Sequence, residues 1–173
     1  MHGDRDAFAM LAEGSLDRLV GTAGLILRDR DAADDAAQEA LVRAWRDLPT
    51  IRNPDVFGSW LYRILLNRCA DVLKRRRRAA QHALSVDRRG IVDDPAAGIA
   101  DREELAAALD RLTDEHRAVV VLRFYVGLSQ SEIADAIGEP LGTVKSRLSR
   151  AIGYLRAELD ATAREARSEE ELA

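Results

Sequence analysis

The chain has 173 residues, of which 47% are hydrophobic and 32% charged, and its formal net charge is −4. This composition is typical of a folded protein and excludes a disordered one, and no run approaches the roughly 18 apolar residues of a membrane-spanning helix. The single cysteine, Cys69, excludes an internal disulfide framework and indicates a reducing, cytoplasmic environment. The three histidines, His2, His82 and His116, are scattered, so we expect no metal site and no cofactor.

The sequence also lacks the patterns of an enzyme or an exported protein. It has no glycine-rich phosphate loop and no serine or cysteine nucleophile with a nearby histidine. Its first residues, MHGDRDAFAM, carry acids where a signal peptide has a basic segment and an apolar core. We therefore expect a cytoplasmic protein that is not an enzyme and is not inserted in a membrane.

The net charge conceals a segregation of charge along the chain. Residues 41–92 carry 12 basic and 4 acidic side chains, and residues 117–156 carry 6 and 3. The other three segments are acidic: 1–40, 93–116 and 157–173. Such blocks create local positive fields in an acidic protein, which nucleic acid can use. Charge blocks also occur on ordinary solvated helices, so this feature alone leaves nucleic-acid binding open.

The first part of the chain is predicted to form three helices, because Ala, Leu, Arg and Glu dominate and strand-like alternation is missing. The first helix is expected over residues 4–27 and the second over 31–48, where Pro49 ends it. The loop TIRNPD follows at 50–55. A long third helix, over 55–78, keeps an apolar period of about 3.6 residues.

A second group of helices follows a stretch without apolar periodicity. That stretch is rich in Ser, Gly, Pro and acids, which is typical of a flexible linker. Helical periodicity returns at DREELAAALDRL and continues in EHRAVVVLRFYV, which Gly127 ends. The predicted fold class is therefore all-α, with two small domains in this order: an N-terminal helical bundle over 1–79, a flexible linker over 80–101, a C-terminal helix-turn-helix domain over 102–160 and an acidic tail over 161–173.

The stretch LSQSEIADAIGEPLGTVKSRLSRAIGYL carries the strongest signal in the sequence. Ser129 and Glu132 form a capping-box pair that begins a helix, and Gly138 can take the left-handed conformation that ends it. We expect a second helix to begin near Thr143 as its N-cap. A small Ala134, a turn glycine and a buried aliphatic residue are what a steep helix pair needs, so the stretch predicts a helix-turn-helix.

The second helix of this pair has an apolar stripe and a cationic outer face. At 100° per residue the stripe consists of Val144, Leu148, Ala151, Ile152 and Leu155. The rest of the helix carries cations and hydroxyls but no acid, whereas a purely structural surface helix usually includes acids for i,i+4 pairing. Arg and Lys suit guanine edges and phosphates, and Ser suits either bases or phosphates. This pattern favours a DNA-reading helix over an ordinary solvated one.

The long third helix combines aromatic and basic side chains. VFGSWLYRILLNR interleaves aromatic residues with Arg63 and Asn67, and LKRRRR places five consecutive cations, Lys74 to Arg78, at its end. We interpret the aromatic rings as mainly core. The helix dipole stabilises terminal cations by only fractions of a kcal/mol, so an anionic partner explains the run better. A basic track beside amide and aromatic groups suits single-stranded or opened DNA.

Taken together, these features resemble a bacterial RNA polymerase sigma factor of the extracytoplasmic-function group, over about residues 4–159. DAADDAAQEALVRAWRDL resembles the helix that docks on the clamp helices of the largest catalytic subunit of core RNA polymerase. FGSWLYRILLNRCADVLKRRRR resembles the segment that recognises and melts the −10 promoter element, and LGTVKSRLSRA resembles the helix that reads the −35 element. The resemblance implies a protein that directs promoter-specific transcription initiation by binding, not by catalysis.

The resemblance assigns residues to each of these tasks. Those implied in binding core polymerase share one helix face at i, i+3 and i+4: Asp35, Gln38 and Glu39. Those implied in reading the −35 element are Thr143, Lys145, Ser146, Arg147, Ser149 and Arg150. Those implied in binding the −10 element are Arg52, Asn53, Trp60, Arg63, Asn67, Asp71, Lys74 and Arg75, with the 50–55 loop in the place of the loop that captures a flipped base.

Three departures from the family pattern lie outside the DNA-facing positions. Asp34 stands where Glu is commoner, Thr113 stands where Pro is usual, and EGSLDRLVG lacks the usual aromatic. Family members are commonly held inactive by an anti-sigma protein clamped between the two domains, which makes such a protein a candidate partner. We also expect the acidic segments, 1–40 and 93–116, to discourage binding to DNA without polymerase.

Two other functions stay open at this point. A stand-alone helix-turn-helix transcriptional regulator would share the C-terminal motif, but it leaves the Asp35 face and the long basic helix unexplained. A protein-binding adaptor would use the basic helix against an acidic partner instead of DNA. Copurification with core polymerase separates the first alternative from a sigma factor, and unchanged −35 selectivity in an Arg150→Ala variant would favour the second.

Overall fold

The computed structural model describes residues 2–50, 53, 56–82 and 99–170. Within these ranges every regular element is helical and no strand occurs, which confirms the predicted all-α fold class. The predicted linker lies largely outside the described residues, as do Arg52 and most of the 50–55 loop. No helix in the described ranges is long and apolar enough to cross a membrane.

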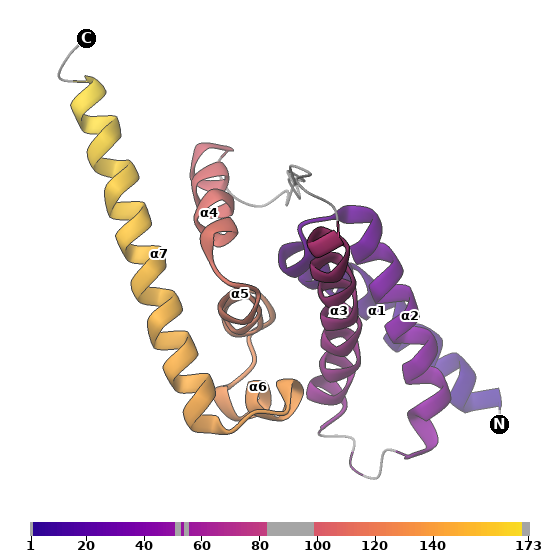
Figure 1. The fold of residues 1–173 in the computed structure, drawn as a ribbon. Helices are drawn as coiled ribbons and strands as arrows, with labels where there is room; N and C mark the ends of the chain where they lie inside the picture. The colour runs from indigo at the N-terminus through magenta and orange to yellow at the C-terminus, as the bar shows by residue number, and fades with distance from the viewer. Residues whose placement is uncertain (1, 51–52, 54–55, 83–98, 171–173) are drawn as a thin grey trace.

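Three long helices form the N-terminal domain, side by side in Figure 1: α1 (His2–Leu27), α2 (Arg30–Asp47) with the short 3-10 turn η1 (Leu48–Thr50), and α3 (Phe57–His82). The buried face of α2 consists of alanines three or four residues apart: Ala33, Ala36, Ala37, Ala40 and Ala44. Helix separation depends on the side chains at the contact, so these small residues let α2 approach its neighbours closely. The packing of these alanines therefore also determines which residues of α2 face outward.

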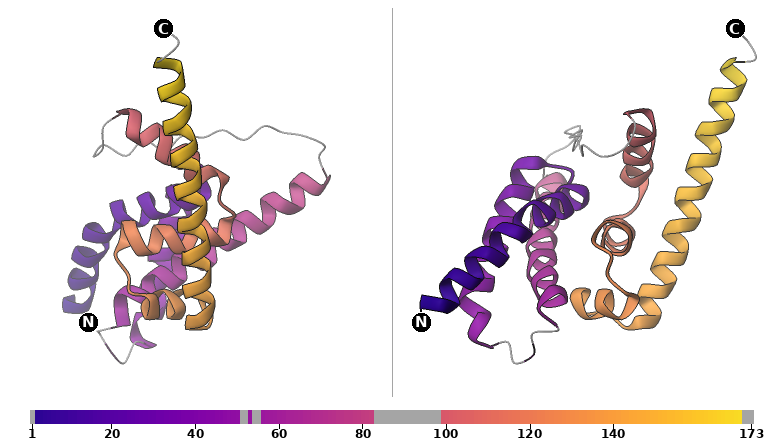
Figure 2. Two further views of the ribbon diagram at one scale, coloured as in Figure 1. Left: turned by 90° about the vertical axis from the view of Figure 1, so that its left-hand side faces the viewer. Right: turned by 180° about the vertical axis from the view of Figure 1, so that it is seen from behind.

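The C-terminal domain contains four helices and one wide turn: α4 (Ile99–Arg111), α5 (Asp114–Val120), the π-helical turn η3 (Val121–Val126), α6 (Gln130–Ile137) and α7 (Leu141–Glu170). The α6 helix and the first turns of α7 form the predicted helix-turn-helix, and both α4 and α5 pack against α7. The last turns of α7 project beyond this cluster, as Figures 1 and 2 show from three directions. The helix therefore continues well past Leu155, into the segment predicted as an acidic tail.

The caps of the helix-turn-helix confirm two predictions and correct a third. The Ser129 hydroxyl accepts a hydrogen bond from the Glu132 amide, and the Glu132 carboxylate accepts one from the Ser129 amide, which completes the capping box. Gly138 has φ 71°, in the left-handed region. Thr143 is not an N-cap: its amide donates to the Pro140 carbonyl at 2.9 Å, because α7 already begins two residues earlier.

The capping box gives a pH-dependent prediction. Its hydrogen bonds to Ser129 lower the pKa of the Glu132 carboxyl, so this contribution to stability is present above the carboxyl's unfolded pKa and is lost as the pH falls through the folded one. We expect Ser129→Ala to cost about 1 kcal/mol at neutral pH and less in acid. Urea unfolding at about pH 7 and about pH 3 measures this, and a Ser129→Ala penalty that stays the same at both pH values would contradict the linkage.

The two domains pack directly against each other through one hydrophobic core. Leu65 of α3, Leu122 of η3 and Ile133 of α6 are fully buried members of the same cluster. The α3 helix lies beside α6, and α1 lies beside η3 and α5. The N-terminal face that carries the predicted −10 residues is therefore turned toward the helix-turn-helix.

Candidate polymerase and nucleic-acid interfaces

The outward face of α2 presents the three residues predicted to bind core polymerase. Asp29 caps the helix by accepting from the Ala32 amide at 2.9 Å, and the buried alanines fix the rotation of the helix. Asp35, Gln38 and Glu39 are all exposed as a result. Glu39 also lies 3.6 Å from the Arg68 guanidinium, which connects this face to α3.

Two apolar side chains extend this α2 face and were missed from the sequence. Val42 is 52% exposed and Trp45 is 39% exposed. They continue the spacing of Asp35, Gln38 and Glu39 by one more turn, so all five share one side of the helix. The stretch EALVRAW contained a signal for them. Val42 and Trp45 are apolar but do not fall on the three- and four-residue spacing of the buried alanines, so they lie outside the buried face of the helix.

The first turns of α7 have the buried stripe and the outer face that the sequence predicts. Val144, Leu148 and Ala151 are buried, while Lys145, Ser149 and Arg150 are exposed. Thr143 and Ser146 are half-buried, and the Ser146 hydroxyl donates to the Thr143 carbonyl at 3.0 Å. This face therefore presents two cations and a hydroxyl on a rigid helix.

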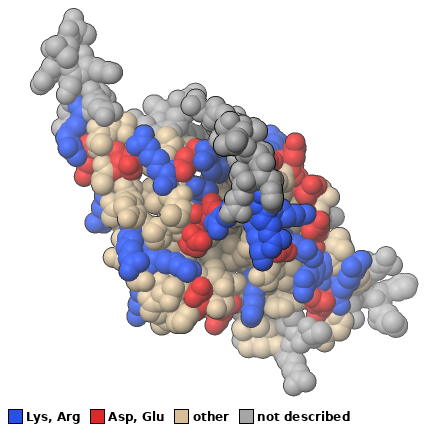
Figure 3. Space-filling view, viewed as in Figure 1, with Lys and Arg blue, Asp and Glu red and all other residues tan. Residues whose placement is uncertain are grey.

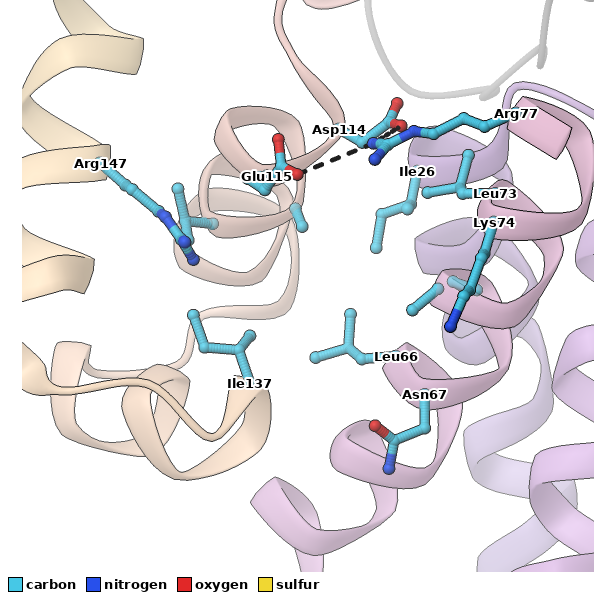
Figure 4. Close-up of a pocket in the computed structure, with 14 residues that line it drawn as sticks. Ile26, Leu66, Asn67, Leu73, Lys74, Arg77, Asp114, Glu115, Ile137 and Arg147 are labelled. Carbon is cyan, nitrogen blue, oxygen red and sulfur yellow. Dashed lines mark hydrogen bonds and ion pairs between the residues drawn. The ribbon is translucent and has the colours of Figure 1, made fainter. Parts of the chain in front are cut away.

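Arg147 departs from the other predicted −35 residues. Its guanidinium lies 3.3 Å from the Glu139 carboxylate, and only 26% of its side chain is exposed. Figure 4 shows it extending from α7 into the groove between the two domains. In this arrangement Arg147 is withdrawn from the outer face.

The predicted −10 residues of α3 form one stripe along the helix. Trp60, Arg63, Asn67, Asp71 and Lys74 follow each other at intervals of three or four residues, and the last four are exposed. Trp60 is half-buried, with its ring 5.8 Å from that of Phe57, as expected for a largely core-packed aromatic. Arg75 is exposed next to the stripe, and Asn53, at the loop before the helix, is also exposed.

The five consecutive cations at the end of α3, Lys74 to Arg78, fall into two groups: some pair with other parts of the chain and others face solvent. Arg76 donates to the Leu27 carbonyl at 2.7 Å and to the Asp29 carboxylate at 2.5 Å, so it holds α3 to the α1–α2 corner. Arg77 pairs with Asp114 of α5 at 2.6 Å. Lys74, Arg75 and Arg78 are exposed. An anionic partner is therefore needed to explain only part of the run. Figure 3 shows Lys and Arg side chains gathered near the end of α3 and a second group on α7, with acidic side chains between the two groups.

Two grooves separate the −10 stripe from the C-terminal domain. The first, about 470 Å³, is lined by Asn67, Lys74 and Cys69 from α3 and by Arg147 from α7 (Figure 4). Cys69 is buried there, and this burial raises the pKa of its thiol to about 12.

The second groove, about 550 Å³, lies between the start of α3 and the turn of the helix-turn-helix. Trp60 and Arg63 line one side, and Asp135 and Glu139 line the other. The two grooves together place four predicted −10 residues opposite the C-terminal domain.

Comparisons with known proteins identify the class. The sequence matches Sigma-70 region 2 over residues 11–79 and Sigma-70, region 4 over residues 108–157. The RNA polymerase sigma factor SigV of Bacillus subtilis (strain 168) is 32% identical over 136 residues, which cover 77% of this chain and 79% of SigV. The ECF RNA polymerase sigma factor SigK of Mycobacterium ulcerans (strain Agy99) is 30% identical over 169 residues, with 92% and 89% covered.

Solved structures agree with these sequence matches. Sigma factor RpoE from Bartonella quintana, determined in complex with the anti-sigma factor NepR, superposes with a TM-score of 0.77 at 28% identity, covering 91% of this chain and 97% of RpoE. CnrH, determined in complex with the cytosolic domain of CnrY, gives a TM-score of 0.69 at 32% identity and 92% coverage of both chains.

The chain belongs to the sigma-70 family, within the extracytoplasmic-function (ECF) group of RNA polymerase sigma factors. It is a factor that directs RNA polymerase to promoters, and the comparisons give no support to a stand-alone regulator. Members of this family act as DNA-binding initiation factors and not as enzymes.

Proposed function

We propose that three separate faces of this chain divide the work of initiation. The α2 face binds core RNA polymerase, the outer face of α7 reads the −35 element and the α3 stripe binds the −10 element. The observation that carries this division is the α7 helix, where Val144 and Leu148 are buried while Lys145 and Arg150 face outward without an acid beside them. A helix of this kind fits the major groove, which admits an α-helix and presents guanine acceptors to Arg and Lys.

The α2 face suits a helical partner such as the clamp helices of the largest polymerase subunit. Asp35 and Glu39 supply charge, and the exposed Val42 and Trp45 supply apolar area that a partner would cover. Exposed aromatic residues beside polar ones are characteristic of the energetic centres of protein interfaces. We therefore add Val42 and Trp45 to the polymerase-binding residues.

The α3 stripe suits the strand that becomes single when the promoter opens. Taking a base out of the stack costs a few kcal/mol, and stacking on an aromatic side chain returns about 1–3 kcal/mol per base. Trp60 offers such a ring, Asn67 offers hydrogen bonds to a base edge, and Lys74 and Arg75 offer charges for phosphates. Asn53 lies before the helix where a flipped base would be held.

We propose the cytoplasm as the place of action and an anti-sigma protein as a further partner. RpoE and CnrH, the similar solved proteins, were determined with NepR and with the cytosolic domain of CnrY. The acidic segments of the chain would weaken its binding to DNA in the absence of polymerase. Tight binding of the isolated protein to a selected promoter duplex at physiological salt would contradict this last point.

The assignment of these three faces can be tested by in vitro transcription with core polymerase over a randomised promoter library. We expect the wild-type protein to enrich two sequence boxes. Lys145→Ala/Arg150→Ala should erase the upstream box only, and Asn67→Ala should erase the downstream box only. Asp35→Ala/Glu39→Ala should reduce transcription from every promoter, because it weakens polymerase binding.

The matched control is Arg156→Ala, an exposed arginine six residues beyond Arg150 on the same helix and outside the predicted −35 residues. This variant should enrich both boxes as the wild type does. Loss of the upstream box in Arg156→Ala, or its persistence in Lys145→Ala/Arg150→Ala, would contradict the assignment of α7.

A further inference from the structure

An exposed leucine begins the helix that the proposed function assigns to the −35 element. Leu141 is the first residue of α7 and is 41% exposed. It belongs to neither hydrophobic cluster of the described residues, whereas Val144 and Leu148 of the same helix are buried in the larger one. An isolated leucine on a protein surface is ordinary, so the position of Leu141 on the helix decides what it can do.

That position is the end of the helix from which bases are read. Leu141 precedes the exposed Lys145 by four residues, so the two side chains lie on the same side of α7, one turn apart. In a helix-turn-helix, the N-terminal residues of the second helix contact base edges in the major groove. Leu141 therefore extends the outer face of α7 by one turn, toward the turn that joins α6 to α7 (Figure 1).

The backbone around Leu141 is held firmly in place. On one side, the Pro140 carbonyl accepts hydrogen bonds from the amides of Thr143 at 2.9 Å and Val144 at 3.2 Å. On the other, the Glu139 carboxylate lies 3.3 Å from the guanidinium of Arg147. The leucine thus starts from a fixed backbone, as a side chain that discriminates between bases must.

The first turn of α7 also lacks the acid that its neighbours carry. The first turn of α5 contains Asp114 and Glu115, and that of α6 contains Glu132, because an acid there interacts favourably with the helix dipole. The first turn of α7 contains none. The residue after Leu141 is the exposed Gly142, where a Cβ atom would meet nothing within 4 Å. This turn therefore offers DNA an aliphatic side chain and bare backbone, without a negative charge.

We infer that Leu141 is a further specificity-determining residue, whose side chain contacts the C5 methyl group of a thymine in the −35 element. In the major groove thymine presents this methyl group, and apolar side chains contact it. Four residues of helix rise about 6 Å and a base pair about 3.4 Å, so the thymine should lie within about two base pairs of the base that Lys145 reads. The inference rests on the proposed function, because it requires the outer face of α7 to lie in the major groove.

The test removes the methyl group from the DNA and the leucine from the protein. The full chain is assembled with core polymerase, and its affinity is measured for the promoter selected from the randomised library. Each thymine of the upstream box is replaced in turn by deoxyuridine, which pairs in the same way and lacks only the C5 methyl group. We expect one of these replacements to weaken binding by about three- to fivefold, as the loss of one buried methyl group does.

The same promoters are then measured with Leu141→Ala. This variant should bind the unmodified promoter about three- to tenfold more weakly than the wild type, and it should lose less than about 1.5-fold on the deoxyuridine promoter to which the wild type is sensitive. Because Leu141 lies outside both hydrophobic clusters, the melting temperature followed by circular dichroism should stay close to that of the wild type.

The matched control is Leu159→Ala. Leu159 is 36% exposed and lies 18 residues beyond Leu141, which is about five turns, so it faces the same side of α7 but about 27 Å farther along the axis. This variant should bind all the promoters as the wild type does. Equal loss in Leu159→Ala and Leu141→Ala would overturn the assignment, since the effect would then not depend on the reading end of the helix.

Other results would overturn the inference as directly. They are a selected upstream box without a thymine, wild-type affinity that no deoxyuridine replacement changes, and a methyl effect that persists in Leu141→Ala. Failure of the proposed function is recognised separately, because the upstream box would then survive in Lys145→Ala/Arg150→Ala. An upstream box that depends on Lys145 and Arg150 but is insensitive to every methyl group would refute the role of Leu141 alone.

Discussion

An Arg150→Ala variant is expected to lower transcription from a promoter with an intact −35 element by roughly 5- to 150-fold, and to lower it little when that element is scrambled. The reason is that a two-pronged arginine contact to guanine discriminates by about 1–3 kcal/mol, and every 1.4 kcal/mol is tenfold. Arg150 is exposed on the rigid α7 helix, and within the described residues no ion pair holds it to the protein. Its guanidinium is therefore free to engage a base edge.

Single-round transcription on the two promoters measures this effect, and Arg150→Lys refines it. Lysine keeps the charge but loses the planar fork, so it should retain general DNA affinity while losing most of the −35 selectivity. An equal loss on intact and scrambled promoters would show that Arg150 contacts phosphate and reads no base. The DNA affinity of the variant would then also depend less steeply on salt concentration, because one charge that neutralises a phosphate is lost.

The second large effect is on stability: Arg117→Met should cost about 3–5 kcal/mol, the range for breaking a buried charged network. Arg117 is 5% exposed and donates to the carbonyls of Leu109 and Leu112, both at 2.8 Å. These groups close the end of α4, where the last carbonyls have no partner within the helix. Burial lowers the pKa of Arg117, but an arginine this far above neutrality stays protonated, with Asp114 beside it at 3.4 Å.

Thermal unfolding followed by circular dichroism measures the effect, and a drop of about 10 °C corresponds to about 4 kcal/mol in a chain of this size. Arg123→Met is the matched control, because Arg123 is exposed and its guanidinium donates to the Leu128 carbonyl at 3.0 Å. We expect it to lower the melting temperature by less than about 3 °C. Equal losses in the two variants would show that the buried network contributes little.

Local features of this fold were predictable from the sequence because their causes are local. The capping box at Ser129 and the left-handed Gly138 depend on residues within one turn, and both are confirmed. The apolar stripe of α7 follows from the 3.6-residue period alone. The Thr143 cap was wrong because Pro140 starts the helix with its own carbonyl, so the threonine lies inside the first turn.

Contacts between distant segments could not be predicted, because nothing in the local pattern encodes them. Arg117 in EHRAVVV has the spacing of an ordinary surface residue, yet it is buried against carbonyls from both domains. The helical wheel predicts Arg147 on the flank of the outer face of α7, and its long, flexible side chain instead turns inward to Glu139. The outward placement of Lys145 and Arg150 followed from periodicity, whereas the position of the α3 stripe opposite the C-terminal domain depends on how the two domains pack.

The length of α7 has a mechanical consequence. It is one continuous helix of 30 residues, so its last turn lies about 30 Å from Arg150 at 1.5 Å per residue. A lever of this length converts a tilt of about 10° into a displacement of about 5 Å at its tip. A spectroscopic label near Glu170 would therefore magnify small rotations of the outer face while standing clear of it.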